Sequence, residues 1–250
     1  MQTSGNTILI TGGGSGIGEA LAHRLHDRGN TVIVAGRRTE ALDRTAAGRE
    51  RIHVLPLDID DPAQISTFAA RLLRDFPETN VLVNNAGIMR LEPGLAHDRD
   101  LRDAEAMIVT NLLGPIRLTN ALVEHLAGRP GAAIINVSSG LAFVPLVAAP
   151  TYSATKAALH SYTVSLRAAL GDRIEVIEIA PPGVRTELTP GQDQVEQFLP
   201  LADFADEVML LLDRTPTPPE ILVDAVLFLR NAEAEGRFET ALTTINPPSR

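Results

Sequence analysis

Tyr152 and Lys156 are the residues whose types and spacing most clearly predict chemistry. Lys156 is the only lysine among 22 lysines and arginines, and Tyr152 is one of two tyrosines. On a helix, side chains four residues apart project from the same face. A free tyrosine titrates at about pH 10, and a neighbouring ammonium favours the phenolate and brings that pKa towards neutrality. The pair therefore predicts a general acid/base, and the alternative is a surface tyrosine beside a solvated lysine.

A glycine-rich segment follows the first apolar run of the chain, over residues 11–18. Glycines allow a sharp turn and let the backbone approach a pyrophosphate, which the free N–H groups of the next helix can bind. The alternative is a glycine-rich turn without a ligand. The segment predicts a dinucleotide site with these cofactor-binding residues: Gly12, Gly14, Ser15, Gly16, Ile17 and Gly18.

Arg37 and Arg38 follow the second apolar run, directly after Gly36. An acidic residue at this place would bind a ribose 2′-hydroxyl, whereas arginine suits a 2′-phosphate. The two arginines therefore favour NADP(H) over NAD(H), unless they only solvate a loop. The positive ring of an oxidised nicotinamide would also help Lys156 to favour the phenolate.

Short apolar runs alternate with longer helical patterns along the chain, and this alternation predicts a parallel sheet with right-handed crossovers. The predicted strands are Thr7–Thr11, Thr31–Ala35, Ile52–Leu57, Val81–Asn84, Ala132–Ser138, Ile174–Ala180 and, as a possible last strand, Ala241–Ile245. The predicted helices are Ile17–Arg28, Thr39–Ala47, Pro62–Asp75, Arg99–Leu126, Thr151–Leu170, Asp203–Asp213 and Pro219–Ala234. The fold class is thus α/β, a doubly wound parallel β-sheet with about seven strands and helices on both faces.

The composition predicts one globular domain over residues 1–250 and limits the classes of partner that it can bind. A net charge of −9 argues against nucleic acid and membrane surfaces as partners. Cysteine is absent, so the chain has neither disulfides nor cysteine-ligated metal. No signal peptide or membrane span is expected, which makes the cytoplasm the default location. Residues 181–202, with four prolines and two glycines, are predicted to be irregular, and residues 186–202 to form a substrate loop.

The chain resembles the short-chain dehydrogenase/reductase family, in its compact single-domain branch, from Thr7 to near the end. The motifs that carry the resemblance are the glycine segment, Tyr152 with Lys156, Asp58-Ile59, Asn84-Asn85-Ala86-Gly87, Asn111 in Thr110-Asn111-Leu112, and Ser139 in Asn136-Val137-Ser138-Ser139-Gly140. The string Pro181-Pro182-Gly183-Val184-Arg185-Thr186 resembles the family's segment after the sixth strand, and together with the serine segment it resembles the DltE-like subgroup.

The resemblance implies a Rossmann fold and transfer of a hydride between a nicotinamide cofactor and a carbonyl or alcohol. Tyr152 would exchange the proton, Ser139 would hydrogen-bond the substrate oxygen, and Lys156 would tune Tyr152 and hold the ribose. Asn111 would hold a water that links Lys156 to solvent. Two alternatives remain open: Ser138 is the functional serine, or Asn111 only bridges backbone groups at a helix irregularity.

The resemblance also implies cofactor contacts from Asp58, Ile59, Asn85, Ala86, Gly87, Val184 and Thr186. Pro182 replaces the family's glycine, which puts contacts at that position in doubt because proline lacks an N–H. Ser15 stands where NADP-dependent members often carry a basic residue, which counts against NADP.

The substrate is expected to be a small to medium, largely apolar carbonyl or alcohol compound that contacts Ser139, Leu141, Phe143 and Tyr152. Alternatively, Arg90 or Arg185 binds an acidic substrate group. A homodimer or homotetramer is expected from the resemblance. Two other functions remain possible: an epimerase or dehydratase that uses bound nucleotide without net turnover, and an NADP(H)-binding redox sensor with little turnover.

Overall fold

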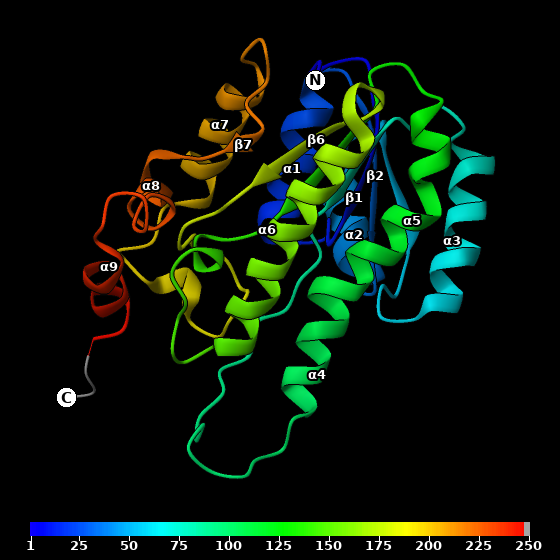
Figure 1. The fold of residues 1–250 in the computed structure, drawn as a ribbon. Helices are drawn as coiled ribbons and strands as arrows, with labels where there is room; N and C mark the ends of the chain where they lie inside the picture. Colours follow the sequence, from blue (N-terminus) through cyan, green and yellow to red (C-terminus); the bar gives the residue numbers. More distant parts are fainter. Residues whose placement is uncertain (248–250) are drawn as a thin grey trace.

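Seven parallel strands form a single sheet in the computed structural model of the protein, which describes residues 1–247 (Figure 1). The strand order is β3-β2-β1-β4-β5-β6-β7. The strands are β1 (Thr7–Thr11), β2 (Thr31–Gly36), β3 (Ile52–Pro56), β4 (Val81–Asn84), β5 (Ala133–Val137), β6 (Glu175–Ile179) and β7 (Glu220–Ile221). The helices are α1 (Gly16–Asp27), α2 (Thr39–Ala46), α3 (Pro62–Asp75), α4 (Arg102–Ile108), α5 (Gly114–Ala127), α6 (Pro150–Leu170), α7 (Leu201–Leu212), α8 (Asp224–Arg230) and α9 (Phe238–Ile245).

Helices cover both faces of the sheet, which explains why its strands are apolar without alternation. In β1, Ile8 and Ile10 pack in one cluster with α1 and α7, while Leu9 packs in another with α3 and α5. All three side chains are fully buried. The predicted doubly wound sheet is therefore confirmed, as are the first six strands within one or two residues at their ends.

The chain order reverses between β1 and β4, because β2 and β3 lie on one side of β1 and the later strands lie on the other. In such sheets the crossover helices diverge at the reversal and leave a crevice outside the carboxyl ends of the strands. Ile8 pairs with Val32 of β2 and with Val81 of β4, so the glycine segment after β1 opens directly onto this crevice.

Two predictions for the C-terminal part are wrong. The predicted strand Ala241–Ile245 lies in helix α9, where Phe238, Ala241, Leu242 and Ile245 pack with Val144 and Leu229 at helical spacing. The predicted helix Pro219–Ala234 begins instead with strand β7, whose two residues pair with Glu178 and Ile179 of β6. A strand of two residues is too short to leave a periodic pattern in the sequence.

The predicted helix Arg99–Leu126 divides into α4, a π-helical turn at Val109–Leu113, and α5. By length and composition alone, Arg102–Ala127 could cross a membrane. In the fold, however, Leu118, Leu122 and Leu126 of α5 are buried against α3 and the sheet. The π-helical turn carries Asn111 and redirects this position towards the segment that follows β4.

Candidate active site

A cleft of about 440 Å³ lies at the carboxyl ends of the strands and brings most of the predicted site residues together. It extends from the glycine segment, past the ends of β2 and β4, to α6 and the segment after β6. The predicted residues that line it are Gly12, Gly14, Ser15, Gly16, Ile17, Arg37, Arg38, Ile59, Asn85, Ala86, Gly87, Ser139, Tyr152, Lys156, Val184 and Thr186.

The glycine segment is held against the end of β4 by polar contacts to Thr11 and Asn85. The Thr11 hydroxyl accepts hydrogen bonds from the N–H groups of Asn85 and Ala86, each 3.1 Å long, and the Asn85 amide donates to Thr11 O at 2.9 Å. Gly12 has φ +67°, and a Cβ there would lie 2.9 Å from Ala86 Cα. The turn therefore requires glycine for its backbone conformation and for the close approach.

Gly18 lies beside the cleft without lining it. A Cβ on Gly18 would overlap Gly12 O and approach the Asn85 amide, so this glycine allows α1 to begin directly behind the turn. Its contact with the cofactor stays a prediction. Gly18 acts through the packing of the turn.

Arg37 and Arg38 lie at the end of the cleft next to the glycine segment. The Arg38 guanidinium donates to Ser15 Oγ at 2.8 Å, and Arg37 Nη1 lies 3.3 Å from Asp60 Oδ2. Two cations therefore border the region in which an adenosine ribose lies in folds of this kind. Ser15 stands where NADP-dependent family members often carry a basic residue. Its hydroxyl accepts the hydrogen bond from Arg38.

Tyr152 and Lys156 lie one turn apart on α6, and both are buried, with 6% and 4% of their surface exposed. Lys156 Nζ donates to Val137 O at 2.9 Å and lies 5.6 Å from the centroid of the Tyr152 ring. The Ser139 hydroxyl lies close enough to the Tyr152 phenol to lower its pKa. The phenol, the ammonium and the serine hydroxyl thus meet at one end of the cleft.

Ser138 and Ser139 have different partners, and this difference separates the two serine alternatives. The Ser138 hydroxyl donates to the buried carboxylate of Glu178, whereas Ser139 Oγ faces Tyr152 and accepts from Leu141 N at 3.1 Å. Successive side chains of an extended segment point to opposite faces. Ser139 is therefore the serine that the structure places beside Tyr152.

Burial moves the pKa values of Tyr152 and Lys156 in opposite directions. It raises the pKa of Tyr152 to about 12, against the opposing effect of the Ser139 hydrogen bond. It lowers the pKa of Lys156 to about 8, against the opposing charge of Glu178. The phenol is thus a neutral proton donor, and the expected pKa near neutrality is not found because burial outweighs the other effects on it.

Asn111 holds the segment that follows β4. Its Oδ1 accepts from Ile88 N at 2.8 Å, and its Nδ2 donates to Ile88 O at 2.9 Å and to Thr155 Oγ1 at 3.3 Å. Gly87 lies between Asn111 and Lys156, because a Cβ there would be 3.3 Å from Asn111 Oδ1 and 3.7 Å from Lys156 Nζ. The side chain therefore joins the Ile88 backbone to the Thr155 side chain at a helix irregularity, and whether it also holds a water stays a prediction.

Three further predicted residues lie outside the cleft lining. The Asp58 side chain accepts a hydrogen bond from the backbone N–H of Asp60, in the same loop, at 3.1 Å. Leu141 packs in the apolar cluster around Tyr152. Phe143 packs edge-on against His160 at 5.0 Å and beneath the Arg230 guanidinium at 4.7 Å, and its contact with the substrate stays a prediction.

The cleft is also lined by residues that the sequence did not single out, among them Thr110 and, within the predicted substrate loop, Leu188 and Gln192. Gln192 Nε2 donates to Val184 O at 2.9 Å and to Thr186 Oγ1 at 3.1 Å. These contacts join parts of an irregular segment, whose path no periodic pattern encodes.

A doubly wound parallel sheet with a glycine-rich turn and a serine–tyrosine–lysine group at its carboxyl edge defines a nucleotide-dependent oxidoreductase. The family model for short chain dehydrogenases matches residues 6–197, and the chain belongs to this family. Its activity is accordingly that of a NAD(P)-dependent oxidoreductase acting on CH–OH or C=O groups.

Comparisons with individual proteins agree with this family. The chain is 43% identical to the uncharacterized oxidoreductase DltE of Bacillus subtilis over 75% of either chain. It is 34% identical to sulfoacetaldehyde reductase 2 of Chromohalobacter salexigens over 88% of this chain and 86% of that one. A short chain dehydrogenase from Burkholderia cenocepacia, solved with NADP, superposes with a TM-score of 0.82 at 27% identity over 100% of both chains.

The lowered pKa of Lys156 predicts how stability depends on pH. Between about pH 8 and the ordinary lysine value of 10.5, the folded state has released this proton while the unfolded state still binds it. The free energy of unfolding of the cofactor-free protein should therefore contain a contribution that rises with pH in this window. Chemical denaturation of the wild type and of Lys156→Met at several pH values isolates the contribution, since Met cannot titrate. If the free energy of unfolding depended on pH in the same way for the two proteins, the predicted contribution of Lys156 would be contradicted.

Proposed function

We propose that Tyr152 is the general acid/base of this oxidoreductase, that Ser139 binds the reacting oxygen and that Lys156 supports Tyr152. The observation that carries the proposal is the position of the Tyr152 and Ser139 side chains, which lie close to each other in a cleft continuous with the glycine segment. Two hydroxyl donors at one point can bind the same carbonyl oxygen and stabilise the charge that develops on it.

The residues of the cleft fit a dinucleotide. Glycines bring the backbone of residues 12–18 close to the end of β4, and Arg37 and Arg38 border the opposite end of the cleft from Tyr152. When bound, the nicotinamide cofactor supplies or accepts the hydride. The cofactor contacts that we propose are those of Gly12, Gly14, Ser15, Gly16, Ile17, Ile59, Asn85, Ala86, Gly87, Val184 and Thr186, all of which line the cleft.

In carbonyl reduction, Ser139 orients the substrate oxygen and Tyr152 delivers its proton to it. The raised pKa of Tyr152 suits this direction, because the phenol keeps its proton until an oxyanion begins to form. Lys156, whose Nζ is held by Val137 O, places a positive charge beside the phenolate that remains. In alcohol oxidation the same groups act in reverse.

Asn111 is proposed to support this site through Ile88, and to hold a water between Lys156 and solvent. The support for the first role is its pair of hydrogen bonds to the Ile88 backbone. Gly87, between Asn111 and Lys156, leaves room at this place because it has no side chain.

NADP(H) is the proposed cofactor in preference to NAD(H). Arg37 and Arg38 line the cleft where a 2′-phosphate would lie, and Gly36 stands in place of an acidic residue. The Burkholderia relative was solved with NADP.

The proposed substrate is a small to medium carbonyl compound with an apolar body. Met89, Leu141, Leu146 and Leu188 gather with Tyr152 in one apolar cluster beside the cleft. Arg90 also lines the cleft, and the sulfoacetaldehyde reductase relative has a name that describes an acidic substrate. A substrate with an acidic group is therefore the second candidate. Arg185 is less suited to this role, because its guanidinium donates to Val195 O and Glu196 O.

Residues 186–202 are proposed to form the substrate loop of the domain. The loop is tied together by the bridge between Val184 and Leu199 and by the contacts of Gln192 to Val184 and Thr186. Leu188 packs in the cluster around Tyr152 and so would touch a bound substrate.

A cytoplasmic homodimer or homotetramer is the proposed form of the protein. Ile108 on α4 and Val164 on α6 expose apolar side chains, 42% and 45% of their surface respectively, and these two helices pack side by side. Apolar residues exposed on adjacent helices suit contact with a second copy of the chain.

Replacing Tyr152 by Phe should lower kcat for carbonyl reduction by about 10²- to 10⁴-fold, because it removes only the proton donor. Cofactor affinity, measured by fluorescence titration with NADPH, should remain that of the wild type. Tyr162→Phe, which changes the other tyrosine of α6, is the matched control and should keep full turnover. Unimpaired turnover of Tyr152→Phe would refute the role of Tyr152. Cofactor binding by the wild type without turnover of any carbonyl compound would favour a redox sensor.

Replacing Arg37 and Arg38 together by Ala should raise the Kd for NADPH at least about tenfold, because each hydrogen bond to a charged phosphate contributes appreciably. The Kd for NADH should change little. Arg51→Ala removes an arginine at the opposite, amino end of the sheet and serves as control. An equal loss of affinity for NADPH and NADH would contradict the proposed contact with the 2′-phosphate.

A panel of aldehydes and ketones, each assayed as a neutral compound and as a carboxylate or sulfonate of the same length, tests the substrate class. We expect higher kcat/KM for the neutral apolar members, and no effect of Arg90→Ala on them. Turnover confined to the acidic members, and lost in Arg90→Ala, would instead establish the second candidate.

A further inference from the structure

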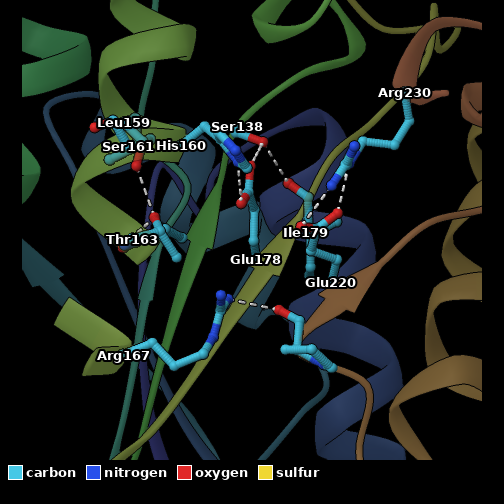
Figure 2. A network of polar contacts seen from close by, with 12 residues as sticks. Ser138, Leu159, His160, Ser161, Thr163, Arg167, Glu178, Ile179, Glu220 and Arg230 are labelled. Carbon is cyan, nitrogen blue, oxygen red and sulfur yellow. Dashed lines mark hydrogen bonds and ion pairs between the residues drawn. The ribbon is translucent and has the colours of Figure 1, made fainter. Parts of the chain in front are cut away.

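A buried carboxylate, Glu178 of β6, lies behind the catalytic end of the cleft and has no place in the mechanism above. Glu178 is fully buried, and both of its oxygens have partners. Oε1 accepts from the Ser138 hydroxyl, and Oε2 lies 2.7 Å from His160 Nδ1 (Figure 2). A buried carboxylate held in this way has the contacts that an anion needs outside water.

Charged groups lie around Glu178 on α6, β7 and α8. From α6 it faces His160, and its charge is near enough to Lys156 to raise the pKa of that ammonium; Arg167 on the same helix donates to Val176 O and Pro219 O. From β7 and α8 it faces the ion pair of Glu220 with Arg230, whose two contacts measure 2.6 and 3.0 Å (Figure 2). β5 contributes the neutral Ser138.

The cluster is better described as an ion-pair network than as a metal site. Ligand atoms of His160, Glu178 and Glu220 lie within 4.8 Å of one another, a spacing that a divalent cation could use. Arg230 already occupies Glu220 with two hydrogen bonds, however, and Ser138 and His160 occupy both oxygens of Glu178. A metal ion would have to displace these partners.

Glu178 is connected to the catalytic groups through both neighbouring elements. Tyr152, Lys156 and His160 are spaced by four residues along α6 and share one face of this helix, so the Glu178 contact to His160 lies one turn beyond Lys156. On β5, Ser138 stands between Val137, whose carbonyl accepts from Lys156, and Ser139.

We propose that Glu178 is a positioning residue for the reaction, and that its buried negative charge holds Lys156 in the ammonium form that supports Tyr152. The burial of Lys156 opposes its charge, since a cation without water is unfavourable unless an anion compensates it. Val137 O supplies a hydrogen bond but no charge. Glu178 supplies the charge, and it raises the pKa of Lys156 against the larger effect of burial.

The inference rests on the role of Lys156 proposed above, but it can be tested without turnover, because Lys156 is the only lysine. Protein labelled with ¹³C at the lysine ε-carbon, without a lysine-containing tag, has one lysine signal, and its chemical shift reports the protonation of Lys156. Glu178→Gln should lower the proton affinity of Lys156 about tenfold, the smaller end of the effect of a nearby opposite charge. An unchanged titration in the folded variant would overturn the proposal.

Two variants serve as controls. Glu175→Gln makes the same change on the same strand, but at a carboxylate that pairs with the N-terminal amine, and it should titrate like the wild type. Glu178→Asp keeps the charge and should restore most of the proton affinity. A shift in Glu175→Gln as large as in Glu178→Gln would assign the effect to the overall charge of the protein and overturn the proposal.

Arg230→Met provides a test of opposite sign that does not require Glu178→Gln to fold. Removing the cation that competes for the Glu178 charge should raise the proton affinity of Lys156, and a fall would overturn the proposal. In steady-state assays of carbonyl reduction, the alkaline limb of kcat should move to lower pH in Glu178→Gln. A uniform loss of kcat at every pH would show a structural role instead. Retained turnover in Tyr152→Phe would refute the proposed mechanism, whereas the NMR titrations test the effect of Glu178 by themselves.

Discussion

The site depends on one interaction, the burial of the Lys156 ammonium between α6 and the end of β5. The side chain is 4% exposed, and its ammonium donates to the carbonyl of Val137, the last residue of β5. A cation in such surroundings requires compensation. Glu178 on the adjacent strand provides it, and Tyr152 lies one turn away on the same helix face. The packing of α6 on β5 and β6 therefore positions the groups proposed to act on the substrate oxygen.

The second constraint is the close approach of the β1–α1 turn to the end of β4. Thr11 and Asn85 exchange hydrogen bonds between backbone and side chain. The contact is so close that a Cβ would not fit at Gly12 or Gly18. This approach joins the two halves of the sheet at the point where the strand order reverses. One continuous cleft thus extends from the arginines after β2 to Tyr152, so a nucleotide and a carbonyl substrate can lie end to end in it.

Periodic patterns predicted the fold well where elements are long. The first six strands are largely apolar, and Asp61 caps α3 before Pro62 by accepting from Ala63 N and Gln64 N. The C-terminal part was predicted less well for a physical reason. Strand β7 consists of two residues whose pairing with β6 supplies the information that a local pattern lacks. In α9, threonines and an isoleucine resemble a strand locally, but Ala241 and its helical neighbours pack on α8 and Val144.

The sequence by itself determined which residue types can do chemistry and in what local order: a phenol and an ammonium one helical turn apart, glycines after the first strand, and arginines after the second. These properties are local, because they depend on neighbours along the chain. Only the tertiary structure decided that Ser139 and not Ser138 faces Tyr152, that Phe143 packs away from the cleft, and that Glu178 stands behind Lys156. The contact of Ser138 with Glu178 depends on β5 and β6 lying side by side, and partners forty residues apart leave no signal in a single sequence.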